Sequence, residues 1–316
     1  MRITPVIFIF CILILSCAEH SSYDPAYLSF QPSPPGNSPR LFAPDHFAPL
    51  VNYRDAAFTP DGKEFYFTRI RQDTFTIMEC RYVNGKWSAP EPARFSGNHN
   101  DFEPCISADG KFFYFASMRP SELKPEMKND IDIWRMEKTS DGWSQPELLD
   151  TVINSTCMEY FPSVTSSGDL YFGRNNQKMT RGDIYVSRFQ KGKFTKAQKL
   201  PATVNLPATS YNACIAPDES YILFSTYIQE NGPWHSDLFI SFRGENGWWS
   251  EAINMGSQIN SPGNDHAPSF SPDGKYLFFA STRGQNSNDK HRIYWISTNI
   301  INQLKKQRNE HGNSDI

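Results

Sequence analysis

The sequence predicts an all-β protein assembled from five copies of one four-stranded unit. Three observations support this prediction: a similar stretch around a Pro-Asp-Gly turn occurs five times, the copies recur at a nearly constant spacing, and two further strand-like segments follow each of the first four copies. The turn positions are Asp61, Asp109, Ser167, Glu219 and Asp273, which lie 48, 58, 52 and 54 residues apart. Periods of this size are typical of repeat architectures.

Each unit is expected to form an antiparallel sheet. Residues 264–283, "NDHAPSFSPDGKYLFFASTR", show the pattern: a strand of small and apolar residues, a turn, and an aromatic return strand. Proline presets the backbone angle that such a turn needs, and glycine accepts the left-handed one. A third strand such as "RIYWIST" follows, and a fourth opens after a Gly-aromatic turn, as in "GWSQPELL".

The arrangement of the fourth strands indicates a closed ring. The last unit has no fourth strand, whereas residues 40–50, "RLFAPDHFAPL", precede the first unit as the other fourth strands precede theirs. A strand from the N-terminus would therefore complete the last sheet, which leaves only short edges. This predicts a β-propeller of five four-stranded blades. The alternative is an open sandwich, but that fold would not explain why the same order of four strands recurs at a fixed period.

The repeats resemble a known propeller family. The stretch "SPDGKYLFFASTR" and its counterparts are similar to the WD-like β-propeller repeat of the Pro-Asp type, found in TolB-like proteins and in the propeller of dipeptidyl-peptidase-type enzymes. The resemblance covers residues 40–299. Because family members often have six or seven blades, a six-bladed TolB-like propeller is the alternative. The G-x-S-x-G nucleophile motif of the hydrolase domain does not occur in this sequence.

The N-terminus predicts a location in the bacterial cell envelope. Residues 1–16 form a signal peptide, whose apolar run is shorter than the roughly 20 residues that span a bilayer. The block "ILSC" resembles a lipobox, so Cys17 is expected to carry lipid; an ordinary cleaved signal is the alternative. Ala18 is not the aspartate that retains enteric lipoproteins at the inner membrane, so we expect a lipid anchor in the outer membrane.

The remaining boundaries follow from composition. Residues 17–39 are rich in Pro, Ser and Gly and are expected to be a flexible tether. Residues 40–299 form the propeller, and residues 300–316 form a polar C-terminal tail. The formal net charge of −3, with 31 basic and 34 acidic residues, argues against a nucleic-acid partner. No metal or cofactor site is expected, because the Cys and His residues lack paired ligand spacing and no Gly-rich phosphate loop occurs.

Recurring charges near the start of each unit predict ion pairs within the blades. Asp101, Glu159 and Asp265 stand at this position, and the return strands end in Arg119, Arg174 and Arg283. The fourth unit, with Tyr211 at the acid position, lacks both charges. In the first unit, which has Tyr53 there, Asp55 is expected to replace the missing carboxylate. Joint loss of both charges favours a structural pair over a ligand site.

The central funnel is nevertheless the predicted ligand site. Its candidate residues are Arg54, Asp101, Glu103, Glu159, Tyr160, Tyr211, Asp265 and His266. This mixture suits polar ligands such as sugars or peptide termini. We therefore expect a lipid-anchored binding or scaffold module for a protein, peptide or glycan.

The alternative is a glycoside-processing enzyme that uses funnel carboxylates. It would need a carboxyl pair about 5 to 5.5 Å apart, or about 6.5 to 9.5 Å apart for inversion. We assign no catalytic residue, because the three acids are the same member of a repeat.

Overall fold

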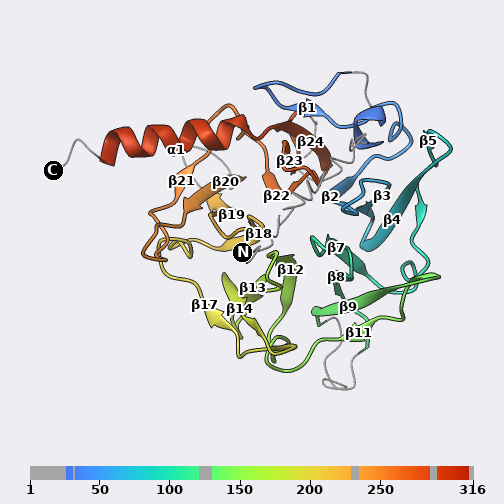
Figure 1. Ribbon diagram of the computed structural model, residues 1–316, viewed down its shortest axis with the longest axis horizontal. Helices are drawn as coiled ribbons and strands as arrows, with labels where there is room; N and C mark the ends of the chain where they lie inside the picture. The colour runs from blue at the N-terminus through green and yellow to red at the C-terminus, as the bar shows by residue number, and fades with distance from the viewer. Residues whose placement is uncertain (1–25, 31–32, 121–129, 229–234, 285–289, 313–316) are drawn as a thin grey trace, which may run out of the picture.

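The computed structural model describes residues 26–30, 33–120, 130–228, 235–284 and 290–312. Its strands form five sheets arranged as a ring (Figure 1), so the prediction of a five-bladed all-β propeller is confirmed. In the first four blades the strands run from the centre outwards in sequence order, whereas in the fifth the outermost strand is β1; neighbouring strands are antiparallel.

The strands of the first three blades are as follows. Blade 1 has β2 (Tyr53–Phe58), β3 (Glu64–Arg71), β4 (Thr74–Val83) and β5 (Lys86–Trp87), with β6 (Glu91–Pro92) also paired to β4. Blade 2 has β7 (Asp101–Ile106), β8 (Phe112–Ser117), β9 (Asp132–Thr139) and β10 (Gly142–Trp143), with β11 (Glu147–Leu148) also paired to β9. Blade 3 has β12 (Glu159–Val164), β13 (Leu170–Asn175), β14 (Gly182–Ser187) and β17 (Gln198–Lys199), with a small hairpin of β15 (Phe189–Gln190) and β16 (Lys193–Phe194).

The last two blades complete the ring. Blade 4 has β18 (Ser210–Ile215), β19 (Tyr221–Ile228), β20 (His235–Phe242) and β21 (Ile253–Asn254). Blade 5 has β22 (Asp265–Phe270), β23 (Tyr276–Ser281), β24 (Arg292–Ser297) and, as its outer strand, β1 (Arg40–Leu41). Arg40 pairs with Trp295 and Leu41 with Tyr294, so the expected closure by the N-terminal strand is observed. Phe42 follows β1 and is fully buried against Phe58 and Phe278, which joins the last blade to the first.

Two segments outside the expected propeller boundaries are also folded. Within the segment expected to be a tether, Ala26–Phe30 forms the 3-10 helix η1. Its Tyr27 is fully buried and Phe30 stacks on Trp87, with ring centroids 4.2 Å apart. The hydrophobic side chains of "AYLSF" therefore attach this part of residues 17–39 to blade 1; residues 1–25, including Cys17, lie outside the described residues.

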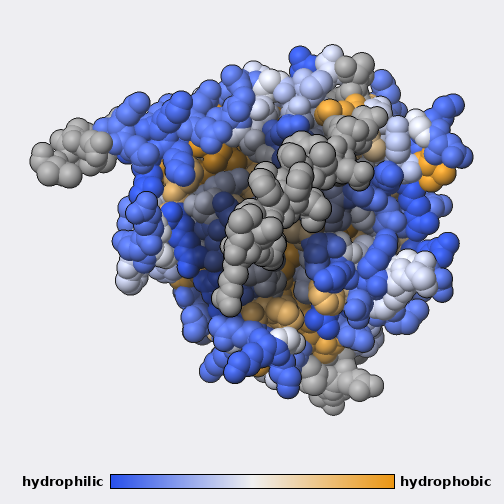
Figure 2. Space-filling view, viewed as in Figure 1, coloured by the Kyte–Doolittle hydropathy of each residue, from blue (hydrophilic) through white to orange (hydrophobic). Residues whose placement is uncertain are grey.

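The C-terminus is a helix where a polar tail was expected. Helix α1 (Asn299–Gly312) runs along the outside of the ring past β21 (Figure 1). Ile300, Ile301 and Leu304 share one face and pack on the core between blades 4 and 5. The surface of α1 seen in Figure 2 is hydrophilic. None of the described helices is long and apolar enough to cross a membrane.

Ion pairs inside three blades hold the loops that lead into them. The predicted pairs form: Arg119 lies 2.7 Å from Asp101, Arg174 lies 2.7 Å from Glu159, and Arg283 lies 2.8 Å from Asp265. Each arginine also donates to a backbone carbonyl of the preceding loop, at Phe95, Ile153 and Ile259 respectively. The pairs therefore connect consecutive blades.

Blades 1 and 4 differ from this pattern, and two details of the prediction are wrong. In blade 4 the strand register places Ser210, not Tyr211, at the acid position, because Ser210 pairs with Thr226 as Asp101 pairs with Ser117. Ser210 itself donates to the carbonyl of Val204 in the loop. In blade 1 Asp55 does not replace the carboxylate, because its side chain bonds Arg54 instead.

A double-mutant cycle on Asp265 and Arg283 tests the structural role of these pairs. Because Asp265 is fully buried, we expect Asp265→Asn and Arg283→Gln each to lower the free energy of unfolding by about 1.5 to 3 kcal/mol. The double variant should lose less than the sum, since one contact is removed only once. Urea unfolding provides the measurement, and strictly additive losses would disprove the pairing. The exposed pair of Asp109 and Lys111 is the control, for which a coupling of only about 0 to 1 kcal/mol is expected.

Candidate functional site

A bulge in the innermost strand of every blade directs side chains into the central channel. The pairing between the two inner strands shifts register after the second residue of the inner strand. The third residue has a positive φ in all five blades: Asp55 (64°), Glu103 (58°), Phe161 (50°), Asn212 (49°) and Ala267 (53°). Such a bulge adds one unpaired residue and re-aims the side chains around it. The second and third residues of every inner strand consequently line the channel.

The second position forms the floor of an upper cavity. Its residues lie opposite small residues of the next strand; the five pairs are Arg54 with Thr68, Phe102 with Ala116, Tyr160 with Gly173, Tyr211 with Ser225, and His266 with Ala280. A Cβ added at Gly173 would lie 2.5 Å from the Tyr160 ring, so the ring needs glycine beneath it. The Tyr160 hydroxyl donates to Asn175 over 3.1 Å, which fixes its orientation.

The upper cavity has a volume of about 990 Å³ and opens at the face where the chain enters the inner strands. Tyr211 and Tyr227 are stacked in its wall, with ring centroids 5.0 Å apart. His266 and His291 line the cavity from the neighbouring blade 5, with Nε2 of His266 2.9 Å from Nδ1 of His291. Burial, His291 and Arg54 together hold the pKa of His266 well below its usual value, so this histidine is neutral at pH 7.

Arg54, Asp55 and Glu103 form a bridge across the waist of the channel. The Nη1 atom of Arg54 lies 3.1 Å from Asp55 and 3.2 Å from Glu103, so one guanidinium serves two carboxylates from blades 1 and 2. The other oxygen of Glu103 accepts from the Phe161 amide of blade 3 over 2.7 Å. Burial, only partly opposed by Arg54, raises the pKa of Glu103 to about 7 and also raises the pKa of Asp55.

The structure brings together five of the eight candidate residues. Arg54, Glu103, Tyr160, Tyr211 and His266 all line the upper cavity. Asp101, Glu159 and Asp265 do not, because each is fully buried in the ion pair of its own blade.

Sequence reasoning missed several residues of the cavity, among them Phe102, Asn212, Tyr227 and His291. Phe102 could have been found by aligning the second position, where Arg, Phe, Tyr, Tyr and His follow one another around the ring. Tyr227 and His291 lie at strand ends outside the repeat motif, where the sequence contains no comparable signal.

Comparison with known proteins supports the fold. No family model matches the chain. An uncharacterized protein from Agrobacterium fabrum is 28% identical over 134 residues, which are 42% of this chain and 38% of that protein, so the match spans less than half of either.

Two solved structures show the architectural likeness. A TolB-like protein from Agrobacterium tumefaciens is 17% identical, with 78% of each chain covered and a TM-score of 0.51. A family-43 endo-arabinanase from Bacillus licheniformis is 11% identical, with 78% of this chain and 93% of that chain covered and a TM-score of 0.50. At these identities the likeness concerns the fold alone. The chain therefore has the TolB-like β-propeller fold, built here from five blades.

Proposed function

We propose that the protein is a non-enzymatic binding module of the bacterial cell envelope, and that its upper cavity binds an oligosaccharide. The observation that carries this proposal is the second position of the inner strands. The scaffold around it repeats from blade to blade, whereas its residues change from Arg54 to Phe102, Tyr160, Tyr211 and His266. When one position differs between blades whose backbone is otherwise the same, and its side chains face a cavity, those side chains are suited to ligand recognition.

The chemistry of the cavity suits a polar ligand without net charge. The Tyr160, Tyr211 and Tyr227 rings provide flat apolar faces with polar edges, which suit a sugar ring. Side-chain amides are oriented in advance: the oxygen of Asn264 accepts from the Ser236 amide over 3.1 Å, and that of Asn175 accepts from Tyr160. Fixing these groups before binding lowers the entropy lost with the ligand.

The cationic groups at the floor present no free positive charge to the upper cavity. Arg54 is held by two carboxylates, and His266 is neutral because its pKa is lowered. The cavity of about 990 Å³ lies at the upper end of the range of roughly 300 to 1,000 Å³ for small-molecule sites. It could hold several sugar units.

A binding screen tests this proposal. The form that starts after Cys17 is titrated with neutral glycans, peptidoglycan fragments and short peptides, and Tyr211→Ala is compared with wild type. We expect a glycan to bind and Tyr211→Ala to weaken it about tenfold or more, which corresponds to about 1.4 kcal/mol. The control is Trp248→Ala, which removes a 71% exposed aromatic side chain that does not line the cavity. Binding of peptides alone, or equal loss in both variants, would contradict the proposal.

Envelope anchoring through Cys17 is the second part of the proposal, supported by the lipobox-like block before it. Lipid chains would supply the membrane affinity, since each buried methylene contributes about 0.8 kcal/mol. Cys17→Ser should therefore move the protein from the membrane fraction to the soluble fraction on cell fractionation. A variant that stays with the membranes would show that Cys17 is not the anchor. Outer-membrane placement is the finer expectation.

Glycoside processing is the second candidate function. The likeness to the family-43 fold and the raised pKa of Glu103, which would suit a general acid, favour it. Two observations argue against it. The carboxylates of Asp101, Glu159 and Asp265 are each ion-paired with the arginine of their own blade. Glu103 shares the guanidinium of Arg54 with Asp55. Carboxylates bound in this way are poorly placed to act on opposite faces of a sugar. Release of sugar from linear arabinan that disappears in Glu103→Gln would establish the enzyme instead.

A further inference from the structure

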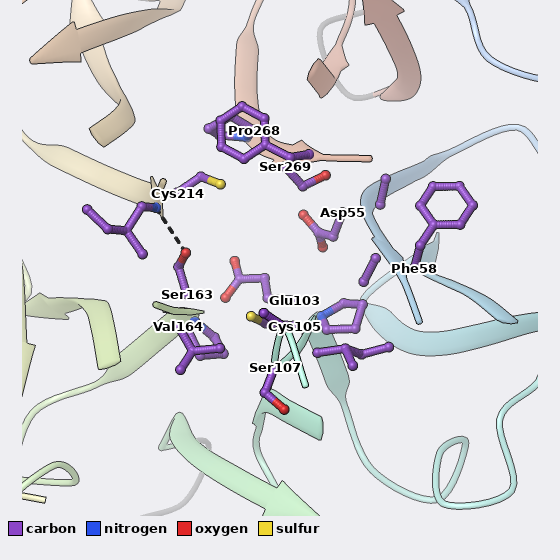
Figure 3. Close-up of a pocket in the computed structure, with 18 of the residues that line it drawn as sticks. Asp55, Phe58, Glu103, Cys105, Ser107, Ser163, Val164, Cys214, Pro268 and Ser269 are labelled. Atoms are coloured by element: carbon purple, nitrogen blue, oxygen red, sulfur yellow. Dashed lines mark hydrogen bonds between the residues drawn. The ribbon is translucent and has the colours of Figure 1, made fainter. Parts of the chain in front are cut away.

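The channel contains a second cavity below the Arg54–Asp55–Glu103 bridge. It has a volume of about 190 Å³ and lies among the second halves of the inner strands (Figure 3). Its walls are mostly apolar and include Pro104, Pro162, Pro268, Cys105, Cys214 and Val164. Burial raises the pKa of the Cys105 thiol to about 12, so this thiol stays protonated and uncharged.

The cavity reaches the protein surface at the face opposite the upper cavity. Its outer end is lined by Pro60, Ala108, Pro217 and Pro272, which belong to the turns between the two inner strands and are partly or fully exposed. The lower cavity is therefore a narrow shaft that enters from the turn face and ends at the bridge. Its volume is that of roughly six water molecules at about 30 Å³ each.

The inner end of the shaft carries two carboxylates against one arginine. Asp55 is 3% exposed; its Oδ1 bonds Arg54, whereas its Oδ2 has no hydrogen-bond partner within the described part of the chain. Glu103 is 4% exposed and shares the same guanidinium. Because one arginine faces two carboxylates, the buried group either has a net charge of −1 or holds a proton on one of the carboxylates. Burying a charge without a partner is costly.

A second acceptor lines the same cavity. The hydroxyl oxygen of Ser269 is buried and also lacks a partner among the described residues. Figure 3 shows Ser269 and Asp55 directed into the same space between the inner strands. The shaft thus offers an apolar wall along its length and oxygen acceptors at its end.

We propose that the lower cavity binds a primary ammonium group carried on a slender, unbranched aliphatic chain. The ammonium has three N–H donors, which match Asp55, Ser269 and Glu103, and its charge balances the second carboxylate. The methylene chain contacts the proline, cysteine and valine side chains, where burial contributes about 0.8 kcal/mol per methylene. This chemistry is shared by a free alkylamine and by a lysine side chain of another protein. The site lies on the other side of the bridge from the upper cavity, although Glu103 lines both cavities. The proposal does not rest on the function proposed for the upper cavity.

Calorimetric titration of the purified full chain with n-pentylammonium and with 1-pentanol tests the charge requirement. The two probes have the same length, but only the first carries a cation. We expect the amine to bind at least tenfold more tightly than the alcohol, because only the amine compensates the carboxylates. Equal affinity for both, or no binding of the amine, would overturn the proposal.

Two variants locate the binding. Asp55→Asn removes the charge without adding backbone strain, since asparagine tolerates the left-handed backbone at this position. It should weaken amine binding at least tenfold. The matched control is Asp61→Asn, an exposed carboxylate of the turn face outside the cavity, which should bind as wild type does. If Asp55→Asn fails to fold, Ala57→Leu narrows the shaft without changing its charge and should also weaken binding. Unchanged affinity in the folded variants would contradict the assignment.

Two further titrations identify the source of the cation. If Nα-acetyl-lysine amide binds as tightly as pentylammonium, the ligand is a lysine side chain of a protein. If only pentylammonium binds, the ligand is a small free amine. Either result supports the site. Stabilisation by Na⁺, K⁺ or Ca²⁺ that depends on Asp55, without any binding of the amine, would show an inorganic cation site and overturn the proposal.

Discussion

One left-handed residue in the innermost strand of each blade is the constraint on which both cavities depend. A regular strand would alternate its side chains, so only every second residue would face the channel. The bulge lets two consecutive residues face it, and the third-position ring of Asp55, Glu103, Phe161, Asn212 and Ala267 then separates the upper cavity from the lower one. A left-handed conformation costs a non-glycine residue about 1 to 2 kcal/mol. Local bonds such as that from the Glu103 amide to Thr68 hold it in place.

Charge in this propeller has two separate roles. The acids of the first position are buried at the joints between blades and hold the incoming loops through their arginines. A buried asparagine supports the loop that follows each of blades 2, 3 and 4: the side chains of Asn154, Asn205 and Asn260 bond the third strand at Ile133, Ile184 and Leu238. With the joints fixed in this way, the neighbouring second and third positions are free to carry recognition.

The repeat made most of the fold predictable from sequence. Five similar turns and a displaced fourth strand sufficed for the blade number, the closure by β1 and the three ion pairs, because each is a direct consequence of periodicity. The surroundings of Asp55 were not predictable, since a bulge changes the direction of a side chain without altering the hydrophobic pattern. Tyr211 was misassigned for a different reason, because the fourth turn was aligned at Glu219. Glu219 occupies the glycine position of the other turns: its φ is 59°, and its amide bonds Ala216 as that of Gly62 bonds Thr59. Helix α1 did have a signal, in Ile300, Ile301 and Leu304, but its polar composition concealed it. The lower cavity arises from five strands together, so no single stretch of sequence indicates it.

Two alanine-to-glycine variants test most directly whether the backbone bulge sets the channel. Ala267 has a φ of 53°, whereas Ala213 is not among the residues with positive φ; both are buried in inner strands, and both changes remove one methyl group. Glycine relieves strain only at Ala267, so Ala213→Gly should lower the free energy of unfolding in urea by about 1 to 2 kcal/mol more than Ala267→Gly does. An equal or larger loss for Ala267→Gly would contradict the left-handed bulge and, with it, the division of the channel.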